Sequence, residues 1–433
     1  METKPSSQLK AGQSVINNDL IDIKGREKRH MIIRSIKKIT HRPQLILRQR
    51  LQREISTKPL ENRFEAEDVT ISKDGSFLRI KDFEFHAIWL RDHCQQSINI
   101  DTKQREVDTA FITQSKGDRE IRSVEVSECG ELLEIEFESG HKSTFKSRWL
   151  RENSYDQQKS KKNDENRKIL WGHDFDLSSV SVGFYDFVNS DKTLERALCF
   201  LEEYGLLYIQ DADTNMTGTK AVADRIGRVR ETLYGRMWDT APKDVPNDTA
   251  YTNVGLPLHT DCTYMRDPPG LQMLHCEARA LRGGANLFVD GFSVVNRLEQ
   301  FEPDAYEFFC KTQLPFYCVD MPVHLRMMAP VIDISRDRHL NQIRFNNADR
   351  GVLSHLSSED VEKFYIFWPI LTSMIHDNSS ILRHTMDAGD VVIFDNHRVL
   401  HGREAFEGYR NMLGCYFDRD EWESRLRVLR GEY

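Results

Sequence analysis

The sequence predicts a mainly β protein: a small β-rich N-terminal domain, then a larger double-stranded β-helix (jelly-roll) domain with buttressing helices. Three observations support this prediction. Many short apolar runs separated by turns follow residue 250, one helix-type segment interrupts them late, and a wholly polar stretch at 156–168 separates them from an earlier strand-rich region. Short strands closed by turns are typical of double-sheet architectures, and helices cover the faces that such sheets leave apolar.

Residues 1–63 are polar or basic, and we expect them to be disordered. Between Met31 and Arg53 there are seven Lys or Arg residues and no Asp or Glu. An amphipathic basic segment without acids is typical of a mitochondrial transit peptide, so 31–56 is predicted to direct the protein to the mitochondrial matrix. Either Met31 is an alternative start or the preceding residues tolerate the signal. The alternatives are a basic helix that binds an anionic partner, and a cytoplasmic location.

Residues 64–155 form the predicted small domain. "VTISKDGSFLRI" contains two strand-like runs around a Lys-Asp-Gly turn, and "ELLEIEFESGHKSTF" alternates apolar and acidic residues before a second turn. Alternation with a period of two indicates half-buried strands. The polar segment 156–168 is the predicted linker, and 169–433 is the large domain.

The large domain begins with predicted helices. One runs over 192–204 with Asp191 as its cap and Gly205 as its stop, and a strand at 206–209 follows. "TKAVADRIGRVRETLYG", residues 219–235, predicts a second helix. The later short strands are expected at 271–276, 285–292, 330–334, 342–347, 390–396 and 411–417, with a helix at 358–376.

Composition excludes several classes of function. The net charge of −8 argues against a nucleic-acid partner and suits a cationic substrate. No run approaches the roughly 18 consecutive apolar residues of a membrane span. The eight cysteines form no Cys-x-x-Cys pair, which favours free thiols in a reducing compartment.

"LPLHTDCTY" places His259 and Asp261 one residue apart in a strand-like run. Residues i and i+2 of a strand project from one face, so both side chains can bind one metal ion. The third ligand is expected from "FDNHRVLHGREAF", either His397 or His401, with His397 the better candidate for a simple surface histidine. Two histidines and a carboxylate suit iron(II) with open coordination positions, although zinc hydrolases use similar sets.

Several longer stretches carry a resemblance to a known family. They are "AIWLRDHC", "RETLYGRMW" in the expected second helix, "LPLHTDCTYMRDPPGLQMLHC", "GGANLFVDGF", "IRFNNADR" and "FDNHRVLHGREAFEGYRNMLGCY". From about residue 80 onward the chain resembles the 2-oxoglutarate-dependent dioxygenases of carnitine biosynthesis, which act on trimethyllysine or γ-butyrobetaine. The resemblance implies Fe(II) held by His259, Asp261 and His401, 2-oxoglutarate as cosubstrate, ascorbate as reductant and a homodimer.

The same resemblance implies a binding site for the far carboxylate of 2-oxoglutarate. Arg410 matches the family's arginine, and Arg403 is a second candidate. A guanidinium group can bind a carboxylate through two parallel hydrogen bonds. Asn286 stands where the family usually has Thr or Ser, and its amide can donate the same hydrogen bond.

The family's cage for a trimethylammonium group matches four aromatic residues, Tyr234, Trp238, Tyr251 and Tyr416. A quaternary ammonium cannot donate a hydrogen bond, so aromatic faces bind it through cation–π attraction. Asp248 matches the acid that the trimethyllysine enzymes add for the α-ammonium group, unless it only caps a turn. Asn346 is expected to bind the substrate carboxylate.

The reaction implied is hydroxylation of trimethyllysine at C-3, with dioxygen consumed and 2-oxoglutarate converted to succinate and carbon dioxide. The alternatives are a γ-butyrobetaine dioxygenase that forms carnitine and a non-catalytic trimethylammonium-binding protein. The butyrobetaine enzymes bind zinc in the small domain with three cysteines and a histidine. Here only Cys94 and His141 match, and two ligands cannot complete a tetrahedral site, so no structural zinc is expected.

Overall fold

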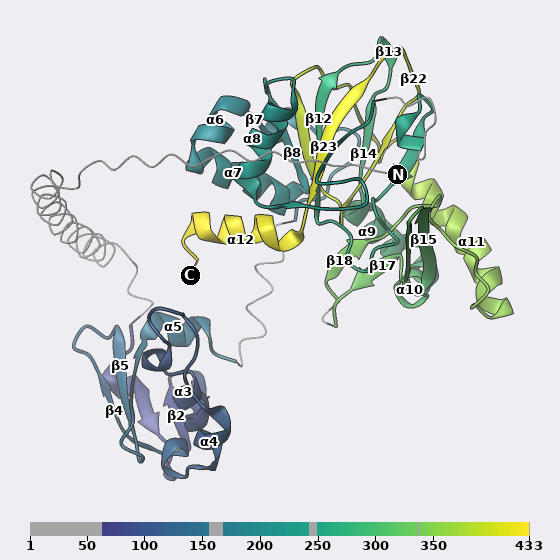
Figure 1. Ribbon diagram of the computed structural model, residues 1–433. Helices are drawn as coiled ribbons and strands as arrows, with labels where there is room; N and C mark the ends of the chain where they lie inside the picture. Colours follow the sequence, from purple (N-terminus) through teal and green to yellow (C-terminus); the bar gives the residue numbers. More distant parts are fainter. Residues whose placement is uncertain (1–62, 156–167, 242–248, 337, 433) are drawn as a thin grey trace, which may run out of the picture. The chain divides into compact units, whose positions relative to one another are not determined.

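The computed structural model describes residues 63–155, 168–241, 249–336 and 338–432 (Figure 1). The predicted transit segment, most of the predicted linker and Asp248 lie outside the described residues. The chain divides into two compact units, Met1–Lys161 and Lys162–Tyr433, and each is described by itself. In the described residues no helix has the length and hydropathy needed to cross a membrane.

The N-terminal unit contains two three-stranded antiparallel sheets. The first is β1 (Val69–Ile71), β2 (Phe77–Ile80) and β3 (Phe83–His86), and the second is β4 (Ile121–Val126), β5 (Leu132–Phe137) and β6 (Lys142–Lys146). Its helices are α3 (Ala87–Asp92), α4 (Thr109–Gln114), α5 (Ser147–Glu152) and the 3-10 helices η2 (Ala66–Asp68), η3 (Gln95–Ser97) and η4 (Gly117–Arg119). Leu133, Ile135 and Phe137 alternate into a fully buried core, as the period of two predicted. The antiparallel pairs β1–β2 and β5–β6 confirm the strands predicted on either side of the two turns.

The C-terminal unit is built around a larger and a smaller sheet. The larger has the order β10-β23-β12-β20-β8-β7, with β9 also paired to β23; the smaller has the order β11-β21-β14-β19. The larger sheet consists of β7 (Ser181–Gly183), β8 (Leu206–Gln210), β9 (Val229–Arg230), β10 (Met237–Asp239), β12 (Leu271–Ala278), β20 (Val391–Asp395) and β23 (Asn411–Phe417). The smaller consists of β11 (Leu256–His259), β14 (Asn286–Asp290), β19 (Leu382–His384) and β21 (Val399–Arg403).

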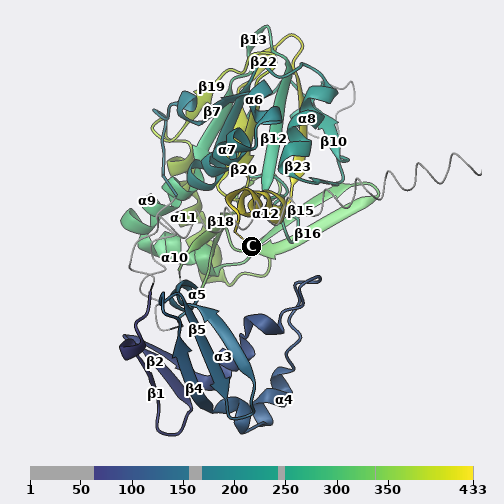
Figure 2. The same cartoon turned by 90° about the vertical axis from the view of Figure 1, so that its left-hand side faces the viewer.

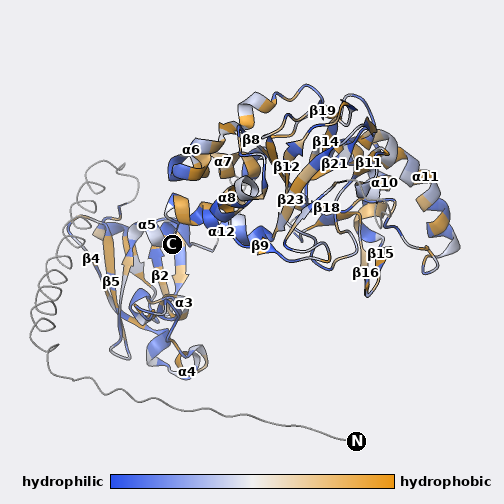
Figure 3. Ribbon diagram, turned by 45° about the horizontal axis from the view of Figure 1, so that its top comes forward, coloured by the Kyte–Doolittle hydropathy of each residue, from blue (hydrophilic) through white to orange (hydrophobic). Residues whose placement is uncertain are grey.

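The two sheets pack face to face. Along β20, Val392 and Phe394 join a core shared with the smaller sheet, while Ile393 faces the opposite side. The rings of Phe394 and Phe288, one from each sheet, lie 5.7 Å apart in an edge-on arrangement. Figure 3 shows that hydrophobic residues are concentrated on central strands such as β12 and β23. The strand period of two therefore gives each sheet one face toward the other sheet and one toward helices.

Helices cover both outer faces. On the larger sheet, α6 (Phe184–Asn189), α7 (Asp191–Tyr204), α8 (Met216–Ile226) and α12 (Arg419–Arg430) share a core with its strands. On the smaller sheet, α9 (Gly291–Phe301), α10 (Pro303–Lys311) and α11 (Ser358–Ile375) share a core with Leu258, Val289 and Leu400. The 3-10 helices of this unit are η7 (Leu177–Val180) and η8 (Thr249–Tyr251).

Three two-stranded ribbons complete the unit. They are β13 (Arg282–Gly283) with β22 (Phe406–Glu407), β15 (Leu314–Asp320) with β16 (Val323–Ala329), and β17 (Ile332–Ile334) with β18 (Leu340–Ile343). Figure 2 shows the β15–β16 hairpin projecting away from the two sheets.

Several sequence-based expectations need correction. The cap of α7 is Ser190, whose hydroxyl accepts from the Thr193 amide, and not Asp191. The second helix ends at Ile226 before Gly227. "RETLYGRMW" does not continue it but runs from the end of β9 through a turn into β10. Seven helices among the described residues were not predicted. Four are short, α3, α4, α5 and α6, and the others, α9, α10 and α12, directly adjoin strand-like runs. The fold is therefore a mixed α/β arrangement with helices on both faces, more helical than predicted.

Candidate metal centre

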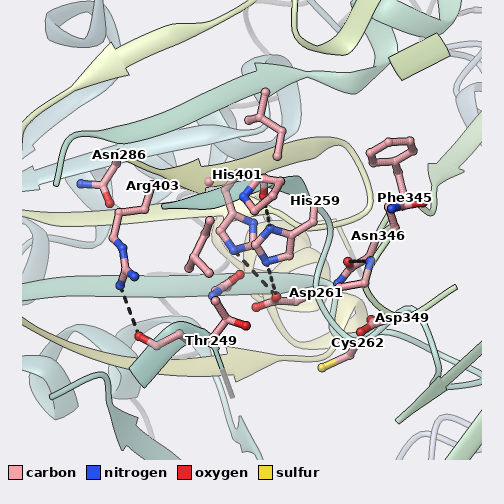
Figure 4. A pocket seen from close by; sticks show the side chains of 18 of the residues that line it. Thr249, His259, Asp261, Cys262, Asn286, Phe345, Asn346, Asp349, His401 and Arg403 are labelled. Atoms are coloured by element: carbon pink, nitrogen blue, oxygen red, sulfur yellow. Dashed lines mark hydrogen bonds and ion pairs between the residues drawn. The ribbon is translucent and has the colours of Figure 1, made fainter. Parts of the chain in front are cut away.

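Strands β11 and β21 bring together the three predicted metal ligands. His259 and His401 lie directly opposite each other in the antiparallel pair, and their ring centroids are 4.3 Å apart. Asp261 follows two residues after His259, and its Oδ1 lies 3.1 Å from His259 Nε2 and 3.8 Å from His401 Nε2. One candidate ligand atom from each residue lies within 4.8 Å of the others (Figure 4). His397 is elsewhere: it is buried rather than on the surface, and its Nε2 meets the Pro268 carbonyl.

Hydrogen bonds orient two of these ligands. His259 Nδ1 lies 2.8 Å from the Pro257 carbonyl, and because a carbonyl only accepts, Nδ1 carries the proton and Nε2 faces Asp261. The Asn396 side chain holds the backbone of Asp261 on both sides: it accepts from the Asp261 amide at 2.8 Å and donates to the Asp261 carbonyl at 3.1 Å. Such outer contacts fix the ligands before a metal ion binds.

The electrostatics of the cluster suit a cation. Burial alone would raise the pKa of Asp261, but the neighbouring histidines, His401 first, outweigh it and hold this pKa well below its usual range. Burial, followed by the charge of His259, lowers the pKa of His401 to about 3, so its imidazole is neutral at pH 7. Asp261 as a carboxylate and His401 as a neutral imidazole are in the protonation states that metal ligands require. Burial alone would lower the pKa of His259, but the hydrogen bond and charge of Asp261 outweigh it and raise this pKa, so a metal ion would displace the Nε2 proton of His259.

The residues present therefore fit a divalent metal ion. Two imidazole nitrogens and one carboxylate oxygen on one side of a cavity match the iron(II) site of oxygenases, in which the other positions remain open. Zinc accepts the same ligand types.

A cavity of about 710 Å³ adjoins the metal ligands, within the usual range for small-molecule sites. All the predicted site residues that the structure describes line it, namely Tyr234, Trp238, Tyr251, His259, Asp261, Asn286, Asn346, His401, Arg403, Arg410 and Tyr416.

The two predicted cosubstrate arginines have different surroundings. Arg410 is buried and donates from Nη2 to Asn286 Oδ1 at 2.9 Å, which leaves the Asn286 amide nitrogen available to donate. Burial, followed by the charge of Arg403, lowers the pKa of Arg410 to about 10. Among the described residues no carboxylate pairs with Arg410, so an anionic ligand would supply the missing countercharge.

Arg403 is occupied by the backbone. It donates to the carbonyls of Ala250, Thr252 and Val254 at 3.2, 2.7 and 2.7 Å. It therefore holds the segment that contains η8 and Tyr251. Arg410 is the better candidate for the far carboxylate of 2-oxoglutarate.

The predicted aromatic residues reach the cavity from three places. Trp238 on β10 pairs with Gly414 on β23, and its ring centroid lies 5.3 Å from that of Tyr416. Tyr234 lies in the turn before β10, with its hydroxyl 3.1 Å from that of Tyr264. Tyr251 ends η8. The tight fit of Trp238 depends on Gly414, because a Cβ there would lie 2.3 Å from the indole ring.

Some cavity residues were missed by the sequence reasoning, notably Cys262, Gln272 and Asp349. Gln272 is a buried polar residue in the apolar strand β12, and its Oε1 has no hydrogen-bond partner among the described residues. A polar side chain on the inward face of an apolar strand was the available signal. Asp349 is, apart from Asp261, the carboxylate that the described residues contribute to this cavity, and it accepts from Thr263 at 2.7 Å.

In the N-terminal unit, Cys94 and His141 lie side by side, with Sγ and Nε2 3.3 Å apart. The Cys94 thiol also meets Gln96 Oε1 at 3.2 Å. Among the described residues, no third histidine, cysteine or carboxylate joins them in a metal-ligand group. The absence of structural zinc stays a prediction.

Known proteins resemble both units. Residues 167–416 match the family described as "Taurine catabolism dioxygenase TauD, TfdA family", and residues 70–151 match "Gamma-butyrobetaine hydroxylase-like, N-terminal". The mitochondrial trimethyllysine dioxygenases of Gallus gallus and Homo sapiens are 33% and 34% identical over 354 residues, covering 80% of this chain and 83% and 82% of theirs. The γ-butyrobetaine dioxygenase of Pseudomonas sp. strain AK-1 is 31% identical over 353 residues, covering 80% of this chain and 90% of its own.

A family match over more than half of the chain coincides with a His-Asp-His cluster, which lies in the matched region beside a cavity with a buried, acid-free arginine. These findings agree with one another. The chain belongs to the TauD/TfdA family and is a 2-oxoglutarate-dependent dioxygenase with a γ-butyrobetaine hydroxylase-like N-terminal domain.

Proposed function

We propose that this dioxygenase hydroxylates N-trimethyllysine at C-3, the first step of carnitine biosynthesis, with Fe(II) as metal and ascorbate as reductant. The observation that carries the proposal is the cavity itself. It combines the metal cluster with the buried Arg410 and with the aromatic side chains of Tyr234, Trp238 and Tyr416. An anionic cosubstrate and a quaternary ammonium substrate can both be bound there, beside the metal.

The chain's own residues hold and orient the reactants. His259, Asp261 and His401 would hold Fe(II), which when bound supplies the activation of dioxygen and the oxidative decarboxylation of 2-oxoglutarate. Arg410 and the amide nitrogen of Asn286 would bind the far carboxylate of 2-oxoglutarate. A guanidinium group that is buried without an acid partner gains most from a carboxylate ligand.

The aromatic side chains would bind the trimethylammonium group. Each good cation–π contact contributes about 0.5–2 kcal/mol, and the cavity walls are largely apolar side chains that exclude water. Tyr251 completes the predicted cage. Arg403 would keep Tyr251 in place through the three carbonyls of its segment.

The amino-acid end of the substrate needs an acceptor and a donor. Asn346 Oδ1 accepts from the Ala348 amide at 2.9 Å, so its amide nitrogen remains to donate to the substrate carboxylate. Asp349 supplies a carboxylate in the same cavity, in addition to the predicted Asp248. Either acid would favour a substrate with an α-ammonium group, which γ-butyrobetaine lacks.

Sequence identity does not separate the two substrates, because the trimethyllysine and γ-butyrobetaine dioxygenases match at 33% and 31%. The alternatives therefore remain γ-butyrobetaine hydroxylation and non-catalytic binding of a trimethylammonium compound. The test is to incubate the purified protein with Fe(II), 2-oxoglutarate, ascorbate and each substrate, and to measure the masses of the products by mass spectrometry. Trimethyllysine should gain one oxygen atom and form succinate in equal amount; oxidation of γ-butyrobetaine alone would reject the substrate assignment.

The head-group acids can be tested separately. A lost charge-assisted hydrogen bond of about 1.5–3 kcal/mol corresponds to about a ten- to hundredfold loss. Asp248→Asn should lose most activity on trimethyllysine and keep or improve any turnover of γ-butyrobetaine, and Asp349→Asn is the matched change on the other acid. If a substitution lowers the activity on both substrates equally, the acid that it replaces has a structural role.

The remaining assignments belong to the same proposal. The two facing sheets support the interpretation of the C-terminal unit as a double-stranded β-helix domain over 169–433. The basic segment at 31–56, which has no acidic residue before Glu54, supports import into the mitochondrial matrix, and homodimer formation is inferred from the family resemblance alone. A reporter fused to residues 31–60 should enter mitochondria, and a diffuse cytosolic signal would contradict the targeting assignment.

A further inference from the structure

The hydroxyl group of Tyr416 donates a hydrogen bond to a predicted metal ligand. Tyr416 Oη lies 2.7 Å from Asp261 Oδ2. The other carboxylate oxygen, Oδ1, is the one that faces the two imidazoles, at 3.1 Å from His259 Nε2 and 3.8 Å from His401 Nε2. The two oxygens of Asp261 are therefore differentiated before any metal ion is present.

The backbone of Asp261 is already held by the fully buried Asn396, through its amide and its carbonyl. Rotation about the side-chain bonds would exchange Oδ1 and Oδ2, and two contacts restrain it. His259 Nε2 lies 3.1 Å from Oδ1, a contact that a metal ion bound to both residues would replace. The Tyr416 hydroxyl donates to Oδ2, which leaves Oδ1 to the ion. Tyr416 is itself buried on β23 of the larger sheet, where it pairs with Gln272 of β12 on one side and Arg230 of β9 on the other.

We propose that Tyr416 is a positioning residue for the metal: its hydroxyl holds Oδ2 of Asp261 and presents Oδ1 to the ion. The ring of the same residue faces the cavity beside Trp238, at 5.3 Å between centroids. One side chain thus serves two sites, with its hydroxyl on the metal ligand and its aromatic face on the cage. The cage part rests on the proposed function, whereas the metal part does not.

The test separates the hydroxyl group from the ring. Tyr416→Phe removes the oxygen atom and keeps the aromatic face. Mn(II), a redox-stable probe, is titrated calorimetrically into the metal-free full chain without cosubstrate or substrate. Loss of an outer hydrogen bond to a metal ligand weakens metal binding by about 10- to 100-fold, and that is the expected rise in the Mn(II) Kd.

Tyr234→Phe is the matched control. It removes the same atom from the same cavity, but the Tyr234 hydroxyl meets Tyr264 and not a metal ligand. Its Mn(II) Kd should equal that of the wild type. The melting temperatures of the metal-free proteins are compared in parallel. If the Tyr416 hydroxyl only stabilised the fold, the variant would lose melting temperature together with Mn(II) affinity.

Equal Mn(II) affinities in the wild type and Tyr416→Phe, or equal losses in both variants, would overturn the proposal. With saturating Fe(II), the KM of Tyr416→Phe for trimethyllysine should stay close to that of the wild type, while Tyr416→Leu should raise it. The KM measurement gives no such difference if the substrate assignment is wrong, but the Mn(II) titration does not depend on any substrate. A wrong substrate assignment can therefore be distinguished from a wrong role of Tyr416 in metal binding.

Discussion

Arg410 and Arg403 are both buried beside the cavity, but they differ in what they bind. The donors of Arg403 are directed to three backbone carbonyls, whereas Arg410 bonds a single side-chain amide, Asn286. A guanidinium group with unused donors is the one that can bind a cosubstrate carboxylate. Two arginines of similar burial therefore have different predicted roles.

Arg410→Ala should raise the KM for 2-oxoglutarate by about ten- to hundredfold, because a charge-assisted hydrogen bond of about 1.5–3 kcal/mol is lost. The KM for the ammonium substrate should change far less. Steady-state kinetics with each reactant varied in turn checks this. Arg403→Ala is the control and should mainly raise the KM for the ammonium substrate. If the KM of Arg410→Ala for 2-oxoglutarate is unchanged, Arg403 is the residue that binds the cosubstrate carboxylate.

Strands β10 and β23 show how an element depends on one glycine. Trp238 pairs with Gly414, and the indole ring occupies the space where a side chain at 414 would lie. The aromatic wall of the cavity therefore requires glycine at this position in β23. This contact cannot be predicted from the sequence positions of Trp238 and Gly414.

Gly414→Ala should displace Trp238 and raise the KM for the ammonium substrate, by about two- to thirtyfold if one cation–π contact of 0.5–2 kcal/mol is lost. The KM for 2-oxoglutarate should stay unchanged, because the atoms nearest to the added Cβ all belong to Trp238 and not to Arg410 or Asn286. Gly183→Ala is the matched control, since its added Cβ meets nothing within 4 Å. If Gly414→Ala binds the substrate as the wild type does, Trp238 is not part of the cage.

At the scale of the whole molecule, a partly buried ion pair joins the last helix to the larger sheet. Asp395, at the end of β20, accepts from Arg419 Nη1 at 3.1 and 3.0 Å, and Arg419 begins α12. Burial alone would raise the pKa of Asp395, but the charge of Arg419 outweighs it and leaves this pKa lowered. A carboxyl with a lowered folded-state pKa stabilises the fold above its unfolded pKa, about 3.9, and this stabilisation is lost as the pH falls through the folded-state value.

Asp395→Asn should therefore lower the free energy of unfolding at pH 7 by about 1–3 kcal/mol. The difference from the wild type should narrow below about pH 4, where the wild-type carboxyl is increasingly protonated. Urea unfolding at several pH values measures both effects. Glu359→Gln, which removes an exposed pair with Lys363, should cost no more than about 0.5 kcal/mol. A pH-independent difference for Asp395→Asn would mean that packing, not charge, is lost.

The sequence by itself determined the local patterns and the chemistry of single residues. The period of two in the β5 segment and the apolar run before Asp395 follow from chain geometry, so those strands were predicted from the sequence. The His-x-Asp spacing predicted two side chains on one strand face. Instead, β11 ends at His259, and Asp261 reaches the metal site from the turn that follows. By contrast, the short helices α3 to α6 were missed, and so were α9, α10 and α12, which adjoin strand-like runs. Packing against the sheets selects the conformation of such segments.

From residue types and spacing alone, His397 and His401 both remained candidates for the third ligand, and it was the family resemblance that implied His401. Only the tertiary structure gives the physical contact: the antiparallel pairing of β11 with β21 brings His401, and not His397, opposite His259. The fold likewise directs Arg403 to a backbone segment and Arg410 to the cavity, and it adds Gln272 and Asp349 to the site. The physical reason is that strand register and side-chain burial depend on long-range contacts. A sequence states which groups are available, but the packing of two sheets determines which of them meet.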